Sequence, residues 1–128
     1  MPEKKIRVLK VYPRHYPIPD DIDNTLEAMQ EIVGGYIETV PINENIVLVC
    51  NEEGKLKNLP KNRDLVWKLG EVDGKQLIVH RDTICGDAFI CGKKDDEFRS
   101  LTAREQWYLF QHFQTAEVDM TAEGVKYL

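Results

Sequence analysis

Four closely spaced cations are the residues with the clearest potential for chemistry. They follow one another with no acid between them: Lys55, Lys57, Lys61 and Arg63. The preceding residues 20–53 carry nine acids and neither lysine nor arginine. Because Lys and Arg side chains bind carboxylate and phosphate groups, this change of sign predicts an anion-binding pocket. A solvated surface is the alternative, since runs of charge often serve only solubility.

Polar residues on either side of the cations complete a candidate ligand-binding site. Turn amides and an arginine fork can bind a carboxylate or phosphate through paired hydrogen bonds. A Gly-Asp pair interrupts the apolar run of residues 83–92, and a glycine inside a strand often marks a close approach of the backbone. We therefore expect the basic loop to pack against this pair and to form the main polar concavity. The candidate ligand-binding residues are Asn51, Glu53, Lys55, Asn62, Arg63, Gly86 and Asp87.

The same residues also allow a purely structural interpretation. Asn51 and Asn62 can stabilise turns through their side-chain amides. Arg63 can form an ion pair with Asp64 or Asp87. In that case the loop contributes stability and contacts no ligand.

The sequence favours a protein without catalytic residues. It contains no P-loop, no dinucleotide-binding glycine pattern, no nucleophile elbow and no paired-histidine zinc helix. The alternative is an enzyme of nucleotide or nucleic-acid metabolism with a scattered active site, in which Asp82, Asp87 and a nearby His or Glu hold a metal ion. Nothing in the spacing of these residues favours that alternative, and we expect no cofactor.

Three cysteines, Cys50, Cys85 and Cys91, lie inside apolar runs. Their odd number and apolar surroundings predict buried, reduced thiols rather than a disulfide framework. The spacing of these cysteines and of His15, His80 and His112 matches no recognised set of zinc ligands. We therefore predict no metal site.

The overall charge restricts the class of partner. The 128-residue chain has a net charge of −5 and a pI near 5.2, whereas a footprint for duplex DNA requires clustered basic residues and a basic pI. We expect no tight binding of duplex DNA. The apolar runs are far shorter than the about 18 residues of a membrane span, and the first residues lack the apolar segment of a signal peptide. These features predict a cytoplasmic protein that binds no membrane, with a small anionic ligand or a host protein as its partner.

The secondary-structure pattern predicts the scaffold for these residues. Alternating apolar residues and turn signals predict strands at 6–12, 36–40, 46–50, 76–79 and 83–92, and Asp73-Gly74 predicts a hairpin turn before residue 76. A cap at Asn24 predicts a helix at 24–33, and a capping box formed by Thr102 and Glu105 predicts a second helix at 102–113. Residues 65–69 fit either a helical turn or a strand. Because strands and helices do not alternate, we predict an α+β fold with a mixed, largely antiparallel sheet of about four to six strands covered by two helices. Residues 1–114 are predicted to form this single domain, and residues 115–128 a tail that is docked or disordered.

Three blocks of residues occur in an order typical of one family. They are the first helix with its Gly34-Gly35 end, the turn and Leu-Pro-x-Asn-Arg loop within residues 47–63, and the run Ile84–Gly92 followed by Phe98, Ser100, Leu101 and Thr102. Over residues 6 to 113 these blocks resemble the domain-of-unknown-function 3846 family, with a longer connection than usual between Leu65 and Arg81. The resemblance implies a small accessory protein of bacteriophages, plasmids and conjugative elements, and it implies no known activity. We therefore expect a non-enzymatic binding module of a mobile genetic element.

Overall fold

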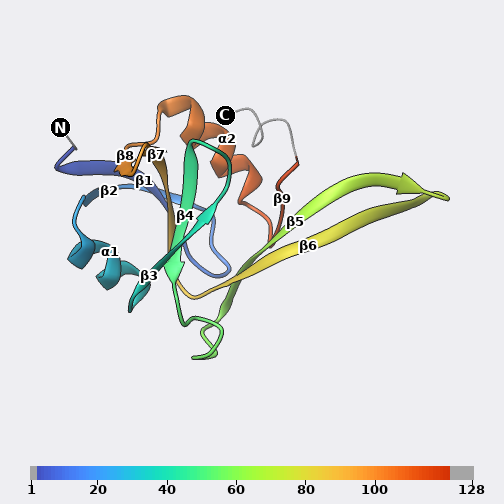
Figure 1. Ribbon diagram of the computed structural model, residues 1–128, viewed down its shortest axis with the longest axis horizontal. Coiled ribbons are helices and arrows are strands. Elements are labelled where there is room, and N and C mark those ends of the chain that lie inside the picture. Colours follow the sequence, from blue (N-terminus) through green and yellow to red (C-terminus); the bar gives the residue numbers. More distant parts are fainter. Residues whose placement is uncertain (1–2, 122–128) are drawn as a thin grey trace.

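The computed structural model describes residues 3–121 and arranges them in two β-sheets and two helices (Figure 1). The larger sheet has six strands: β1 (Lys5–Val11), β2 (Ile18–Asp23), β3 (Ile37–Pro41), β4 (Ile46–Asn51), β7 (Ala88–Lys94) and β8 (Glu97–Arg99). Their order is β2-β1-β7-β4-β3, β8 pairs with β7, and each of these pairings is antiparallel.

The central strands β4 and β7 are buried on both faces of this sheet. All six residues of β4 are buried, as are the first five of β7. A strand covered on both sides needs apolar residues at consecutive positions, which explains the uninterrupted run Ile46–Cys50. One face belongs to a core that includes Met29, Val49 and Phe89, and the other to a core that includes Leu48 and Ile90.

Helix α1 (Leu26–Val33) packs on the first of these faces. It begins at Thr25, whose side chain accepts a hydrogen bond from the Ala28 amide, one residue later than the predicted cap. It ends at Gly34 in the left-handed conformation, with φ of 78°, which glycine adopts without strain. Only two residues of the helix, Met29 and Val33, are buried.

Helix α2 (Ala103–His112) lies on the opposite side of the sheet. The predicted capping box is confirmed: the Thr102 hydroxyl accepts from the Glu105 amide, and the Glu105 carboxylate accepts from the Thr102 amide. The α+β class is also confirmed. The prediction that two helices cover the sheet is wrong, because each helix buries few residues and a second sheet supplies much of the core on the α2 side.

This second, three-stranded sheet was not predicted. It consists of β5 (Lys61–Val72), β6 (Lys75–Cys85) and β9 (Glu117–Asp119), in the order β6-β5-β9. β5 and β6 are antiparallel, whereas β9 runs parallel to β5. The ambiguous residues 65–69 are therefore part of a strand. The predicted Asp-Gly hairpin turn is confirmed, since Asp73 and Gly74 both have positive φ, at 53° and 76°.

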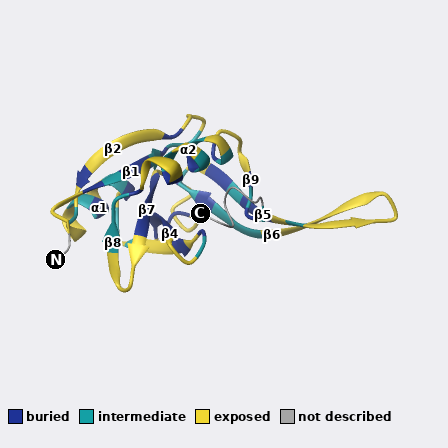
Figure 2. Ribbon diagram, turned by 90° about the horizontal axis from the view of Figure 1, so that it is seen from above, coloured by how far each residue is buried: buried dark blue, intermediate teal, exposed yellow. Residues whose placement is uncertain are grey.

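The outer part of the β5–β6 hairpin, residues 67–80, projects from the rest of the described chain and is called the arm below (Figure 1). The rest is called the body. Residues 69–80 are all exposed, and Figure 2 shows both strands of the arm uncovered while the inner ends of β5 and β6 enter the core.

The chain after α2 returns to the second sheet. Val118 and Met120 are buried, and the Met120 amide donates to the Val66 carbonyl at 2.8 Å. Residues 122–128 of the predicted tail lie outside the described residues. In the described part of the chain, neither helix has the length or apolar composition needed to cross a membrane.

The cysteines differ in burial. Cys50 and Cys91 are buried as predicted, and burial raises the pKa of each thiol to about 12. Cys85, the last residue of β6, is only half-buried, so the prediction is wrong for this thiol. The reason is its position at the inner end of β6, where it borders a surface hollow together with Lys55 and Asp82.

Candidate functional site

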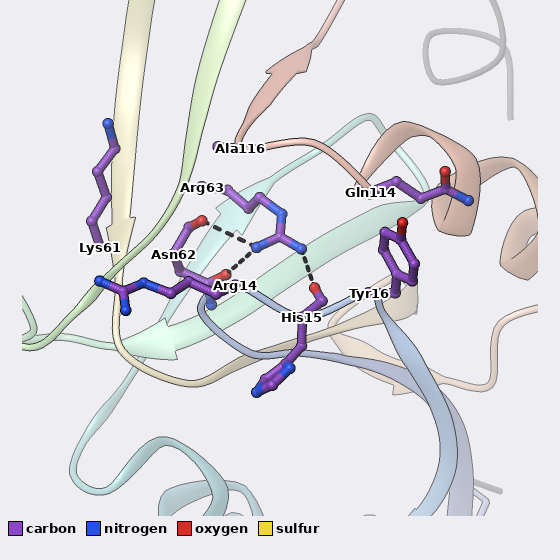
Figure 3. Close-up of a pocket in the computed structure, with 8 residues that line it drawn as sticks. All are labelled: Arg14, His15, Tyr16, Lys61, Asn62, Arg63, Gln114 and Ala116. Atoms are coloured by element: carbon purple, nitrogen blue, oxygen red, sulfur yellow. Dashed lines mark hydrogen bonds between the residues drawn. The ribbon is translucent and has the colours of Figure 1, made fainter.

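Arg63, near the start of β5, has its side chain enclosed by main-chain carbonyls. Its exposed fraction is 2%. Nε and Nη2 donate to the Phe113 carbonyl at 3.0 and 2.8 Å, and Nη2 also donates to the His15 carbonyl at 2.6 Å. Nη1 donates to the Asn62 side-chain oxygen at 2.8 Å and points to the Tyr12 carbonyl at 3.4 Å. The guanidinium thus joins the β1–β2 loop, β5 and the end of α2 (Figure 3).

Within the described residues, no carboxylate forms an ion pair with Arg63. The predicted alternative of a pair with Asp64 or Asp87 is wrong. Asp64 instead accepts from Lys61 and Thr83, and Asp87 is exposed elsewhere. Burial lowers the pKa of Arg63, but an arginine starts so far above neutrality that it stays charged. Among residues 3–121, the buried charge of Arg63 is therefore balanced by carbonyl dipoles alone.

A hollow of about 280 Å³ lies over this guanidinium, between the β1–β2 loop, the start of β5 and the connection from α2 to β9. Figure 3 shows the side chains around it. Carboxylates are absent from this lining set, which consists of Arg14, His15, Tyr16, Lys61, Asn62, Arg63, Gln114 and Ala116.

The cations of this hollow are not equivalent. The Lys61 ammonium forms an ion pair with Asp64, so its charge is partly neutralised. Arg14 is exposed at the tip of the β1–β2 loop with φ of 65°, and no ion pair within residues 3–121 involves it. Arg63 supplies positive potential, but its N–H groups already have protein acceptors. Arg14 is therefore the cation best placed to contact an anion directly.

Two other hollows are lined by three of the remaining predicted residues, Asn51, Lys55 and Asp87. One, of about 290 Å³, is lined by Asn51 and Lys55, but Lys55 is paired with Asp82, and Glu38 and Glu52 add negative charge. The other, of about 420 Å³, is lined by Asp87 together with a cluster of acids: Asp20, Asp21 and Glu31. Neither hollow combines an unpaired cation with an absence of carboxylates.

The Asn51 side chain forms hydrogen bonds with the backbone of neighbouring segments. The Asn51 amide donates to the Val33 carbonyl at 3.1 Å, and its oxygen accepts from the Glu53 amide at 2.8 Å. Its amide nitrogen would lie 2.9 Å from a Cβ at Gly35, so a side chain there would collide with it. The Glu53 side chain is exposed and forms an ion pair with Lys57. The turn-stabilising role weighed for Asn51 is thus the one observed.

Asn62 and Gly86 bring the basic loop against the start of β7. The Asn62 amide donates to the carbonyls of Val11 and Gly86, each at 2.8 Å. The Gly86 amide donates to the Pro60 carbonyl at 2.7 Å, and Gly86 has φ of 85°. The predicted packing of the loop against the Gly-Asp pair is confirmed for Gly86. The prediction that one concavity contains both Arg63 and Asp87 is wrong, because the two residues line different hollows.

The comparison with known families is consistent with the residue blocks described above. The family model of a domain of unknown function, DUF3846, matches residues 6–114. The chain belongs to the DUF3846 family. No curated protein and no solved structure matches the chain.

The hollow of this DUF3846 protein contains residues that sequence reasoning missed. The predicted ligand-binding set contains none of Arg14, His15, Tyr16 and Gln114. The one usable signal was the position of Arg14 between two prolines, which marks an extended loop. Nothing in the sequence joins residue 14 to residue 114, because their proximity depends on the packing of α2.

Proposed function

We propose that the protein binds a small anion, carrying a phosphate or carboxylate group, in the hollow over Arg63. The observation that carries this proposal is a buried guanidinium whose acceptors in the described part of the chain are carbonyl oxygens, beneath a lining without carboxylates. In a region of low dielectric such a charge attracts an anion more strongly than a surface lysine does. An anion in the hollow would neutralise the buried positive charge of Arg63.

The proposed contacts divide into two kinds. Arg63 acts through its field, since its donors are committed to Phe113, His15 and Asn62. Direct hydrogen bonds would come from the Arg14 guanidinium and the Gln114 amide, which border the hollow. Its volume of about 280 Å³ is near the lower end of the range for ligand pockets, which favours a compact ligand.

The experiment is a calorimetric titration of the full chain with inorganic phosphate, pyrophosphate and citrate. Arg14→Gln should weaken binding roughly tenfold, the effect of losing one charge-assisted hydrogen bond. Lys93→Gln is the matched control, because it removes the same charge from an exposed side chain at the far end of β7 and should leave the affinity unchanged. Failure of all three anions to bind, or equal weakening by both substitutions, would contradict the proposal.

Ion pairs along β1 and β2 support the expectation of no tight duplex DNA binding. Three amino-terminal cations are paired across these strands, with nitrogen to oxygen distances of 2.8 to 3.2 Å: Lys5 with Asp23, Arg7 with Asp21, and Lys10 with Asp20. Cations paired in this way release few counterions from a phosphate backbone. Together with the Lys61–Asp64 pair, they leave little free positive charge near the hollow for a duplex.

The wider expectations stay predictions. They are a role as an accessory protein of a mobile genetic element, a cytoplasmic location, a host protein as partner, and the alternative of an enzyme acting on nucleotides or nucleic acids. None of them has a specific observation in its favour comparable to the cationic hollow.

A further inference from the structure

The hollow over Arg63 has two chemically different sides. Figure 3 shows the Arg14 and Lys61 side chains on one side of the Arg63 guanidinium and the Tyr16 ring on the other. One side therefore presents cations, and the other presents a flat aromatic surface. A ligand that contacts both sides needs an anionic group at one end and a group that packs on an aromatic ring at the other.

Tyr16 offers a ligand an aromatic ring that is supported from behind. Its exposed fraction is 66%, although the next residue of the loop, Pro17, is buried. The ring makes an edge contact with Phe110, with the two centroids 6.3 Å apart and the planes at 61°. The other aromatic ring of the lining set, that of His15, points away from Arg63 in Figure 3. Tyr16 is thus the ring on which a ligand in this hollow can stack.

The loop that carries Arg14 and Tyr16 is held in place by the buried guanidinium. Arg63 donates to the His15 carbonyl at 2.6 Å and points to the Tyr12 carbonyl at 3.4 Å. The His15 amide also donates to the Tyr12 carbonyl, at 3.2 Å. Arg14 and Tyr16 flank His15, so both side chains start from a fixed backbone. Groups that are ordered before binding lose less conformational entropy when a ligand arrives.

The rest of the lining favours a ring with polar edges over a hydrocarbon chain. Within this lining set, Ala116 carries the only purely aliphatic side chain, and the others bear polar or charged groups such as the Gln114 amide. A hydrocarbon chain would displace water from these groups without replacing its hydrogen bonds. A heteroaromatic ring has a π face for Tyr16 and polar atoms at its edge for the neighbouring groups.

We infer that the ligand of this hollow is a phosphate monoester that carries a heteroaromatic ring, the class to which nucleoside monophosphates belong. This inference rests on the proposed function, since the phosphate is the anion that the positive charge of Arg63 attracts. The phosphate contacts Arg14, and the ring stacks on Tyr16. A nucleoside monophosphate has a single sugar between these two groups, so it is a compact molecule with its anion and its ring at opposite ends.

Stacking on Tyr16 has an expected size. Stacking of one base on an aromatic side chain changes affinity by about tenfold or more, and it depends little on which base is present, because every base has a π face. We therefore expect AMP to bind about tenfold more tightly than ribose 5-phosphate, which has the same phosphate and sugar without the ring.

The test is a calorimetric titration of the full chain with AMP, ribose 5-phosphate and inorganic phosphate. Tyr16→Ala should weaken AMP binding about tenfold and leave ribose 5-phosphate binding unchanged. Tyr16→Phe keeps the ring and should retain the affinity for AMP. Tyr36→Ala is the matched control: it removes a tyrosine of similar exposure, 70%, that lies outside the lining set, and should change neither affinity.

The outcomes separate this inference from the proposed function. Binding of inorganic phosphate and ribose 5-phosphate, with AMP no tighter than ribose 5-phosphate, would overturn the inference and leave anion binding intact. Failure of every anion to bind would overturn both. Equal losses of AMP affinity from Tyr16→Ala and Tyr36→Ala would also overturn the inference.

A second variant guards against loss of structure. Tyr16→Leu keeps an apolar contact for Phe110 but has no aromatic ring, so it should weaken AMP binding as much as Tyr16→Ala does. Circular dichroism melting of each variant establishes that the body is folded. Full AMP affinity in a folded Tyr16→Leu protein would contradict stacking on this ring.

Discussion

The body and the arm contain similar β-forming residues but place them in opposite environments. In β4 and β7, Val, Ile, Leu and Phe side chains are almost fully buried between two cores. In the arm, Val72, Leu77 and Val79 have exposed fractions of 40 to 60%. Apolar alternation in a strand therefore indicates a face that needs a partner, and it does not say whether the same molecule supplies that partner. The contrast predicts that substitutions of equal chemistry will have very different costs in the two regions.

The largest difference is expected between Phe89→Ala in the body and Val79→Ala in the arm. Phe89 is fully buried at the centre of the larger sheet, so its truncation should lower the free energy of unfolding by about 3–5 kcal/mol. Val79→Ala should cost less than about 0.5 kcal/mol. Urea denaturation measures both values. Equal costs would contradict the contrast between a packed body and an open arm.

Arg63→Met should have the next largest effect. It leaves the carbonyls of His15 and Phe113 without a donor in a buried region and should cost about 3 kcal/mol. Arg63→Lys should recover only part of this loss, because an ammonium cannot reproduce the planar fork. Arg104→Met, on the exposed side of α2, is the control and should be nearly neutral. A loss below 1 kcal/mol at Arg63 would show that water replaces the guanidinium easily.

A smaller effect on stability is expected for the Glu105–Arg99 ion pair in the body. Burial raises the pKa of Glu105, but hydrogen bonds from Arg99 at 2.9 and 3.0 Å and from Thr102 outweigh it, so the pKa is lowered from its ordinary value of 4.5. Glu105→Gln should cost about 1–2 kcal/mol at neutral pH.

The pH dependence of this pair has a definite sign. A carboxylate with a lowered pKa in the folded state contributes stability above its unfolded pKa and loses it as the pH falls through the folded pKa. The cost of Glu105→Gln should therefore shrink as the pH falls below 4.5. Thermal melting of both proteins between neutral and acid pH measures this change. A cost that grows in acid would contradict the assigned direction.

The smallest effect concerns a thiol at the surface of the body. Cys85 is half-buried at the inner end of β6, where it borders a hollow, whereas burial raises the pKa of Cys50 and Cys91 to about 12. A polar disulfide reagent should modify Cys85 in the native protein and the other two thiols only on unfolding. Cys85→Ser should abolish the fast phase and leave the melting temperature almost unchanged. Fast reaction of all three thiols would show that the body opens readily.

The candidate site was only partly predictable from the sequence. The basic loop drew attention to Asn62 and Arg63, which do border the cationic hollow. The expected partner of Arg63 was a carboxylate, yet its acceptors are the carbonyls of Tyr12, His15 and Phe113 and the side chain of Asn62. Every residue carries a main-chain carbonyl, so no residue type marks those positions in advance.

The sequence by itself determined the features in which a few neighbouring residues form their own hydrogen bonds and backbone turn. The Thr102–Glu105 capping box, the Gly34 helix end and the Asp73-Gly74 turn all form as predicted. Local backbone geometry and short-range hydrogen bonds fix such features wherever they occur. Only the tertiary structure decided that β5 and β6 leave the larger sheet and that Arg14, Arg63 and Gln114 enclose one hollow. These arrangements depend on contacts between segments about fifty residues apart, whose free energy arises from burial and packing of the whole chain.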